Sequence, residues 1–176
     1  MVYYSPNRLP EFFRILTSGP ASAAALIKGS PSFPDITGTV AFYEASPGTL
    51  VYTELSGLPF STLPCSENIF AFHIHEGTGC TGTETDPFAD AKVHLNPGNC
   101  PHPSHMGDLP PVFSNEGYAF SIVFTDRFSI DDILGHTIIL HSRPDDFTTQ
   151  PAGNSGEKIA CGVIQDVRSF PRGRMF

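Results

Sequence analysis

The stretch NIFAFHIHE, residues 68–76, alternates between two sets of side chains from Phe70 onward. One face of the stretch is apolar and the other carries two histidines, with Phe70, Phe72 and Ile74 opposite Ala71, His73 and His75. This period of two residues is typical of a β-strand. Because residues two apart on a strand point the same way, His73 and His75 are placed to hold one metal ion.

Other parts of the chain predict further strands. They are GTVAFYE (38–44), TLVYTELSGL (49–58), GYAFSIVFT (117–125), LGHTIILHS (134–142) and residues 159–164. The turn signal Ser46-Pro47-Gly48 between the first two predicts a hairpin. The short apolar segment 21–27 fits either a helical turn or a first strand. Short strands without long helices indicate an all-β sandwich or barrel.

The composition fits one all-β domain and argues against some partners. The 176 residues include 16 glycines and 17 prolines, which suit short strands joined by many turns. The formal net charge of −8 disfavours nucleic acid or an anionic membrane surface as the main partner. No apolar run approaches the roughly 18 residues that span a bilayer. Residues 1–20 lack a basic region followed by an apolar core, so we expect no signal peptide and a cytoplasmic protein.

Two long segments without periodicity, residues 77–111 and 143–156, interrupt the strands. Irregular loops of this length in a compact domain usually carry function. The first contains HLNPGNCPHPSHMGD (94–108), in which the prolines exclude a helix. A pair of histidines on a strand is, taken alone, more often a surface or hydrogen-bonded feature than a metal site. The pair together with the loop histidines and His141 predicts metal binding, since imidazole suits zinc and copper.

Short motifs along the chain occur in a fixed order: FHIHE (72–76), HLNP (94–97), HMGDL (105–109), GHTIILH (135–141), DD (145–146), GNSG (153–156) and ACGVI (160–164). Together they resemble the copper/zinc superoxide dismutase family over residues 37–164. The resemblance implies an eight-stranded Greek-key β-barrel or sandwich with two long functional loops. It implies a family domain at residues 36–165, with an N-terminal extension at 1–35 and a C-terminal tail at 166–176.

The resemblance also implies a copper site and a zinc site that share one histidine. The residues that match the copper ligands are His73, His75, His94 and His141, and those that match the zinc ligands are His94, His102, His105 and Asp108. His94 thus matches the bridging histidine. In the family, this histidine takes up a proton after reduced copper has released the imidazole. Asp145 matches the aspartate that links a copper-ligand histidine to a zinc-ligand histidine, with a capped polar turn as the alternative. The step from His102 to His105 is shorter than in familiar eukaryotic members, so the zinc loop is trimmed.

Lys158 departs from the family pattern. The family has an arginine two residues before the alanine of ACG, where it attracts and orients the superoxide anion, and this chain has Lys158 there. Lysine keeps the charge but lacks the planar fork of arginine. We therefore expect Lys158 and the bridging His94 to serve catalysis, at a lower rate than in an arginine-bearing enzyme.

Four cysteines leave three complete pairings open. The resemblance implies a disulfide between Cys80 and Cys161. We expect a second bridge between the remaining Cys65 and Cys100, with two buried free thiols as the alternative. Because disulfides are less usual in a reducing cytosol, an extracytoplasmic location is the alternative to the cytoplasmic one.

The function that these patterns predict is that of an oxidoreductase. The resemblance implies a superoxide dismutase that converts superoxide to dioxygen and hydrogen peroxide by copper redox cycling, with structural zinc. The alternative is a non-catalytic copper/zinc-binding protein on the same fold. A zinc hydrolase is disfavoured, because Glu76 would point to the strand face opposite His73 and His75. Superoxide is the expected partner, nucleic acid and membrane are not expected, and a homodimer is one assembly that the resemblance allows.

Overall fold

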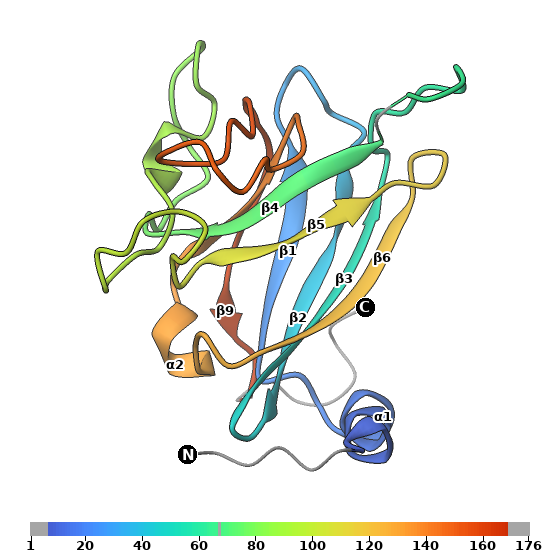
Figure 1. Ribbon diagram of the computed structural model, residues 1–176, viewed down its shortest axis with the longest axis vertical. Coiled ribbons are helices and arrows are strands. Elements are labelled where there is room, and N and C mark those ends of the chain that lie inside the picture. The colour runs from blue at the N-terminus through green and yellow to red at the C-terminus, as the bar shows by residue number, and fades with distance from the viewer. Residues whose placement is uncertain (1–6, 67, 169–176) are drawn as a thin grey trace.

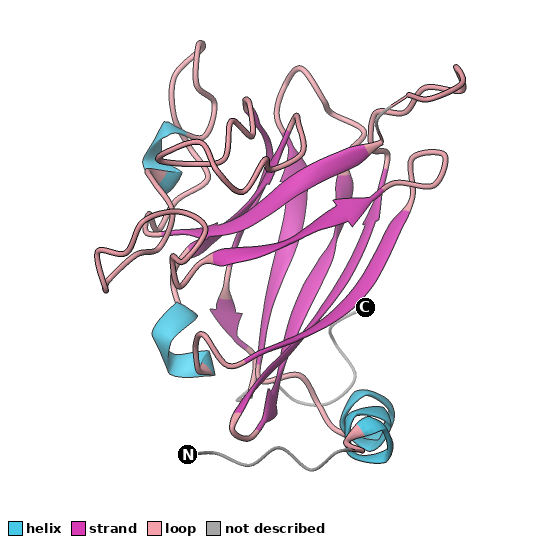
Figure 2. Ribbon diagram, in the orientation of Figure 1, coloured by secondary structure: helices cyan, strands magenta, loops and turns pink. Residues whose placement is uncertain are grey.

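The computed structural model describes residues 7–66 and 68–168, and strands dominate this part of the chain (Figures 1 and 2). The helices are α1 (Leu9–Ser18), η1 (Ala89–Ala91) and α2 (Ile130–Ile133). The strands are β1 (Ala23–Gly29), β2 (Thr37–Ala45), β3 (Gly48–Ser56), β4 (Ile69–His75), β5 (Asp108–Phe113), β6 (Ala119–Thr125), β7 (Thr137–His141), β8 (Lys158–Val163) and β9 (Gln165–Asp166). Within these described ranges, no helix is both long and apolar enough to cross a membrane.

The sheet has the strand order β5-β4-β7-β8-β1-β2-β3-β6, and the short β9 pairs with β1. Its end strands, β5 and β6, contact each other, so the sheet curls into a barrel (Figure 1). β6 follows β5 in the chain but pairs with β3, and β7 then returns to pair with β4. These crossings are those of a Greek key. The predicted eight-stranded all-β barrel is confirmed.

β1 settles the ambiguous segment 21–27 as a strand. It pairs with β2 through Ala23 and Phe42, and with β8 through Lys28 and Cys161. The barrel therefore takes in residues that precede residue 36, where the sequence suggested that the domain starts. Of the expected N-terminal extension and C-terminal tail, residues 1–6 and 169–176 lie outside the described residues.

The long loop that was expected to reach residue 111 ends earlier, because β5 begins at Asp108. Its sequence, DLPPVF, hides the strand, since Pro110 and Pro111 have no N–H for a ladder hydrogen bond. The prolines are accommodated because β5 is an end strand and its register with β4 shifts between Phe70 and Phe72. This strand places Asp108 opposite His73.

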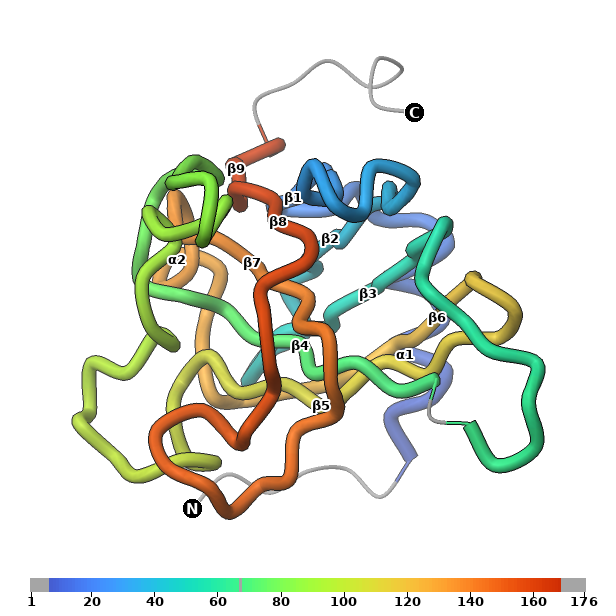
Figure 3. The backbone as a smooth tube through the Cα atoms, turned by 90° about the horizontal axis from the view of Figure 1, so that it is seen from above, coloured from blue at the N-terminus to red at the C-terminus, as the bar shows by residue number. Residues whose placement is uncertain are grey.

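Both faces of β4 are buried, the apolar face and the face that carries the histidines. Phe70, Phe72 and Ile74 pack in the main core. His73 and His75 are 0% and 2% exposed on the opposite face, beneath the irregular segments. Seen from above, residues 95–107 and 142–157 lie side by side next to β4 and β5 (Figure 3). The fold thus buries a cluster of polar side chains between one barrel face and two loops.

Candidate metal centre

Two groups of buried side chains bring ligand atoms together. The four-histidine group consists of His73, His75, His94 and His141, and the mixed group consists of His94, His102, His105 and Asp108. Within each group the ligand atoms all lie within 4.8 Å of one another. Every one of these residues was expected from the sequence, and the structure brings all of them together. Only His94 belongs to both groups.

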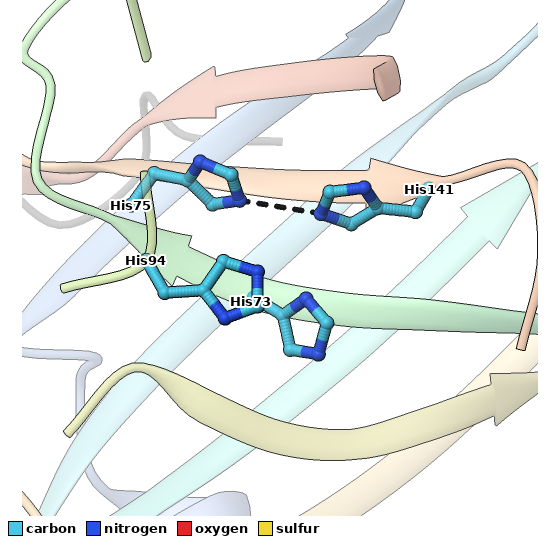
Figure 4. Close-up of side chains that lie close together, drawn as sticks. All are labelled: His73, His75, His94 and His141. Atoms are coloured by element: carbon cyan, nitrogen blue, oxygen red, sulfur yellow. Dashed lines mark hydrogen bonds between the residues drawn. The ribbon is translucent and has the colours of Figure 1, made fainter. Parts of the chain in front are cut away.

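His75 and His141 point at each other across the four-histidine group (Figure 4). Nδ1 of His75 donates to the Lys92 carbonyl oxygen at 3.0 Å, and Nδ1 of His141 donates to that of Gly156 at 3.4 Å. Each Nε2 therefore presents a lone pair, and the two Nε2 atoms are 3.2 Å apart. Facing lone pairs repel each other unless a cation lies between them. Metal–nitrogen bonds of about 2.0 Å in a tetrahedral arrangement put two ligand atoms at about this separation.

Asp145 accepts hydrogen bonds from one histidine of each group. Its Oδ2 accepts a hydrogen bond from Nε2 of His73 at 2.8 Å, and its Oδ1 accepts one from Nε2 of His102 at 2.9 Å. The opposite nitrogens, Nδ1 of His73 and Nδ1 of His102, are buried without a hydrogen-bond partner. Burial alone would raise the pKa of Asp145, but hydrogen bonds from His73, the Phe147 N–H and His102 outweigh it and hold the pKa well below its usual range.

His94 reaches from one group to the other. Its Nδ1 lies 2.8 Å from Oδ1 of Asp108 and 3.3 Å from Nδ1 of His105. Its Nε2 is buried without a hydrogen-bond partner. The His94 ring lies 4.1 Å from the His73 ring and 4.9 Å from the His75 ring, centroid to centroid (Figure 4). One imidazole thus offers one nitrogen to each group.

The mixed group contains one carboxylate, that of Asp108. Its Oδ2 accepts the backbone N–H of His105 at 3.0 Å, which fixes the carboxylate at the start of β5. Burial works to raise the pKa of Asp108, yet hydrogen bonds from His94 and the His105 N–H prevail and lower it. Nδ1 of His102 lies 3.1 Å from Oδ2 of Asp108 without forming a hydrogen bond to it. Three imidazoles and one carboxylate form a donor set that suits a closed zinc site.

Burial favours the neutral form of three histidines of the four-histidine group, His73, His75 and His141. It is the largest cause that lowers the pKa of His73, His75 and His141, and for His75 and His141 the pKa falls well below 6.5. Neighbouring imidazoles act in the same direction, and the Lys158 ammonium adds to the effect on His141. A neutral imidazole has the lone pair that a metal needs. The orphaned nitrogens and the donor types therefore fit two bound metal ions.

Comparison with known proteins decides the family. Residues 36–164 match the family model described as copper/zinc superoxide dismutase (SODC). The chain is 34% identical over 150 residues to the Cu-Zn superoxide dismutase of Deinococcus radiodurans, over 75% of this chain and 79% of that protein.

The chain belongs to the copper/zinc superoxide dismutase family. Two further relatives are similar over most of their length. Identity with the Cu-Zn superoxide dismutase of Caulobacter vibrioides is 32% over 159 residues, covering 82% of this chain and 86% of the relative. Identity with Cu-Zn superoxide dismutase 2 of Aquifex aeolicus is 32% over 146 residues, covering 74% of this chain and 80% of the relative. The family's cofactors are copper and zinc, in agreement with the two groups.

Lys158, which the sequence predicts to attract the substrate, is the first residue of β8 and pairs in register with His141. Its Nζ donates to Oδ2 of Asp86 at 2.8 Å and to the Phe88 carbonyl oxygen at 3.0 Å. The side chain is only 16% exposed. The ammonium is therefore fixed, and its charge is already paired.

The disulfide expected for a superoxide dismutase of this family, Cys80–Cys161, is confirmed. The expected second bridge is wrong, because Cys65 and Cys100 are free, and both are exposed rather than buried. Cys65 belongs to the segment 57–66 between β3 and β4. This segment lies on the opposite side of the barrel from residues 95–107 (Figures 1 and 3). Mutual hydrogen bonds between Asn96 and the Cys100 backbone hold Cys100 within that segment.

Two residues that the sequence did not single out hold the 95–107 segment, which carries two residues of the mixed group. Nη1 of Arg127 donates to the Pro103 and His105 carbonyl oxygens at 2.9 and 3.0 Å. Gln150 pairs with the backbone of His102 on both sides, accepting its N–H at 2.9 Å and donating to its carbonyl oxygen at 2.7 Å. These contacts bind backbone groups across 22 to 48 residues of sequence, so no motif or spacing signals them.

Proposed function

We propose that this chain is a superoxide dismutase that binds copper at the four-histidine group and zinc at the mixed group. The reaction converts two superoxide anions and two protons into dioxygen and hydrogen peroxide. The observation that carries the proposal is His94, whose two nitrogens face different groups, with Nε2 lacking any protein partner. Such an arrangement suits an imidazole that bridges two metals.

When bound, copper supplies one-electron redox chemistry at the substrate, and zinc supplies a redox-silent charge that organises the loop. The protein's residues supply the rest. Nε2 of His94 is a buried base without another partner, so it can hold a proton and deliver it to a reduced substrate oxygen. Asp145 fixes two rings through its two oxygens. The Lys158 ammonium attracts the anionic substrate toward His141.

The alternative, a non-catalytic copper/zinc-binding protein on the same fold, is less favoured. The four-histidine group is complete, and the positive charge of Lys158 is near enough to lower the pKa of His141. A protein that only stores metal needs neither a base with a free nitrogen nor a substrate-attracting charge.

Single-ligand variants test which group holds which metal. We expect His75→Ala to lose copper and keep zinc, because His75 belongs only to the four-histidine group, and His105→Ala to lose zinc and keep copper. His136→Ala is the matched control, since His136 binds the Glu76 carbonyl oxygen outside both groups. Elemental analysis after dialysis gives the answer. Loss of both metals from either variant, or retention of copper in His75→Ala, would contradict the assignment.

We make two further proposals, on the cellular compartment and on the oligomeric state of the protein. The Cys80–Cys161 disulfide indicates an oxidising environment, so we propose the extracytoplasmic alternative over the cytoplasmic location. Cell fractionation tests this, and a protein confined to the reducing cytosol would contradict it.

We also propose that the protein is a homodimer. It engages neither nucleic acid nor an anionic membrane surface, in keeping with its net charge of −8. Sedimentation equilibrium that shows only a monomer would contradict the dimer.

A further inference from the structure

The charge expected to attract superoxide is not alone. The Lys158 ammonium lies 2.8 Å from Oδ2 of Asp86, a carboxylate whose side chain is 44% exposed. The pair joins residues 72 positions apart, so no local sequence pattern brings them together. An ion pair at this distance cancels much of the field that either charge would project. Asp86 is therefore able to control the charge on which substrate attraction depends.

Asp86 is held in place by its own loop. Its backbone N–H donates to Oγ1 of Thr83 at 3.0 Å, and its carbonyl oxygen accepts the N–H of Thr83 at 2.9 Å. Its Oδ1 accepts the N–H of Phe88 at 3.2 Å, which leaves Oδ2 for Lys158. The Cys80–Cys161 disulfide ties the same loop to β8. A carboxylate fixed in this way can fix a flexible lysine.

The surroundings of Lys158 are acidic. It lines an open cavity of about 470 Å³ together with Glu84, Asp86 and Glu157, and it is the one cationic side chain among the lining residues in the described part of the chain. A small anion that enters this cavity meets three carboxylates and one ammonium. The balance between Asp86 and Lys158 thus decides whether the local field attracts or repels it.

We propose that Asp86 is a positioning residue for substrate guidance, which holds the Lys158 ammonium beside His141 and offsets part of its positive field. This inference rests on the proposed function for its biological meaning. The ion pair keeps the Lys158 ammonium at one place. It also weakens the positive electric field that the ammonium projects into solvent.

Three variants separate the two effects. Asp86→Asn keeps the shape and a hydrogen-bond acceptor but removes the negative charge. Asp86→Ala removes both the charge and the anchor. Asp90→Asn is the matched control, because it makes the same change in net charge on the same loop, and Asp90 binds Thr81 instead of Lys158. Copper and zinc contents are first shown to be equal to those of the unmodified protein.

Two measurements are made on each loaded variant. The first is the second-order rate constant for superoxide consumption against ionic strength. The second, independent of turnover, is the dissociation constant of azide, a small anion, followed through the visible absorption of copper. For Asp86→Asn we expect the rate constant to rise about two- to fivefold at low salt, a gain that shrinks as salt screens it. Azide affinity should tighten by a similar factor, and Asp86→Ala should gain less because its ammonium is no longer held.

Asp86→Asn values equal to those of Asp90→Asn, in both rate and azide affinity, would overturn the proposal. A gain in Asp86→Ala as large as in Asp86→Asn would overturn the holding role. If the loaded, unmodified protein fails to consume superoxide, the proposed function fails instead, and the azide series still decides the role of Asp86.

Discussion

Asp145 shows how one side chain makes two metal groups depend on each other. Its two oxygens accept from Nε2 of His73 and Nε2 of His102, so each ring turns its Nδ1 toward its own group. A hydrogen-bonded carboxylate also makes a ligating imidazole more basic. Both effects need both oxygens to act as acceptors.

The amide variant Asp145→Asn tests this dependence. Its NH₂ group cannot accept, so one of the two histidines loses its partner. We expect the affinity for at least one metal to fall about 10- to 100-fold, as measured by chelator competition. Asp146→Asn is the control, because Asp146 binds Thr148 and Thr149 in its own turn. Unchanged affinities in Asp145→Asn would remove Asp145 from the metal centre.

The lowered pKa values of His75 and His141 predict how the metal-free protein responds to acid. Burial is the main cause of both shifts, and the values fall well below 6.5. As pH falls through about 6.5, the unfolded chain binds protons that the folded chain excludes, so stability is lost as pH falls. We expect the Tm of the metal-free protein, measured by calorimetry, to drop by several degrees between about pH 7.5 and about pH 5.5. The His141→Gln variant should show a smaller drop, and a Tm that rises over this range would contradict the shifts.

The residues of the two groups were predictable because their residue types occur in ordered motifs. Chemistry restricts copper and zinc ligands to few side chains, and a strand places His73 and His75 on one face. The Lys158–Asp86 pair was not predictable, since charged residues are common and only the fold brings these two within 2.8 Å. The second disulfide was mispredicted because pairing depends on distance in space, which spacing along the chain does not determine.

Among the elements, strands with clear alternation were predicted, and those with unusual composition were not. The prediction located β4, β2 and β3 to within a few residues. It missed β5, whose two prolines hide it, and left β1, rich in alanine, undecided. It gave no helix for α1, which has no buried residue and contacts the barrel through the stacking of Phe12 on Phe124. An element that contributes little to the core leaves a weak signal in the sequence.

Two neighbouring segments hold residues 95–107, where we propose zinc ligands, in shape. Arg127, which follows β6, holds the Pro103 and His105 carbonyl oxygens, and Gln150 holds the backbone of His102. We expect Arg127→Ala and Gln150→Ala each to weaken zinc binding about 10-fold while copper affinity stays within twofold, as measured by competition with a chromogenic chelator. Arg14→Ala, at an exposed position of α1, is the control. An equal loss of both metals would indicate general unfolding of the loop instead.

For the molecule as a whole, the barrel and the two long loops enclose the buried histidines and carboxylates of the two groups. The net charge of −8 works against an anionic substrate, so attraction must be local and must come from cations near the four-histidine group. We propose that Lys158, at the start of β8, supplies such a cation. The distribution of charge thus matters more for this reaction than its total.

Pulse radiolysis of the copper- and zinc-loaded protein tests whether the chain is a catalyst of superoxide dismutation. We expect superoxide to decay in a first-order process with a rate proportional to protein concentration, and one preparation to remove many equivalents without loss of rate. We also expect His141→Ala to fall to the uncatalysed background and His136→Ala to keep the full rate. Consumption that stops at one equivalent per protein, or an active His141→Ala, would contradict the proposed function.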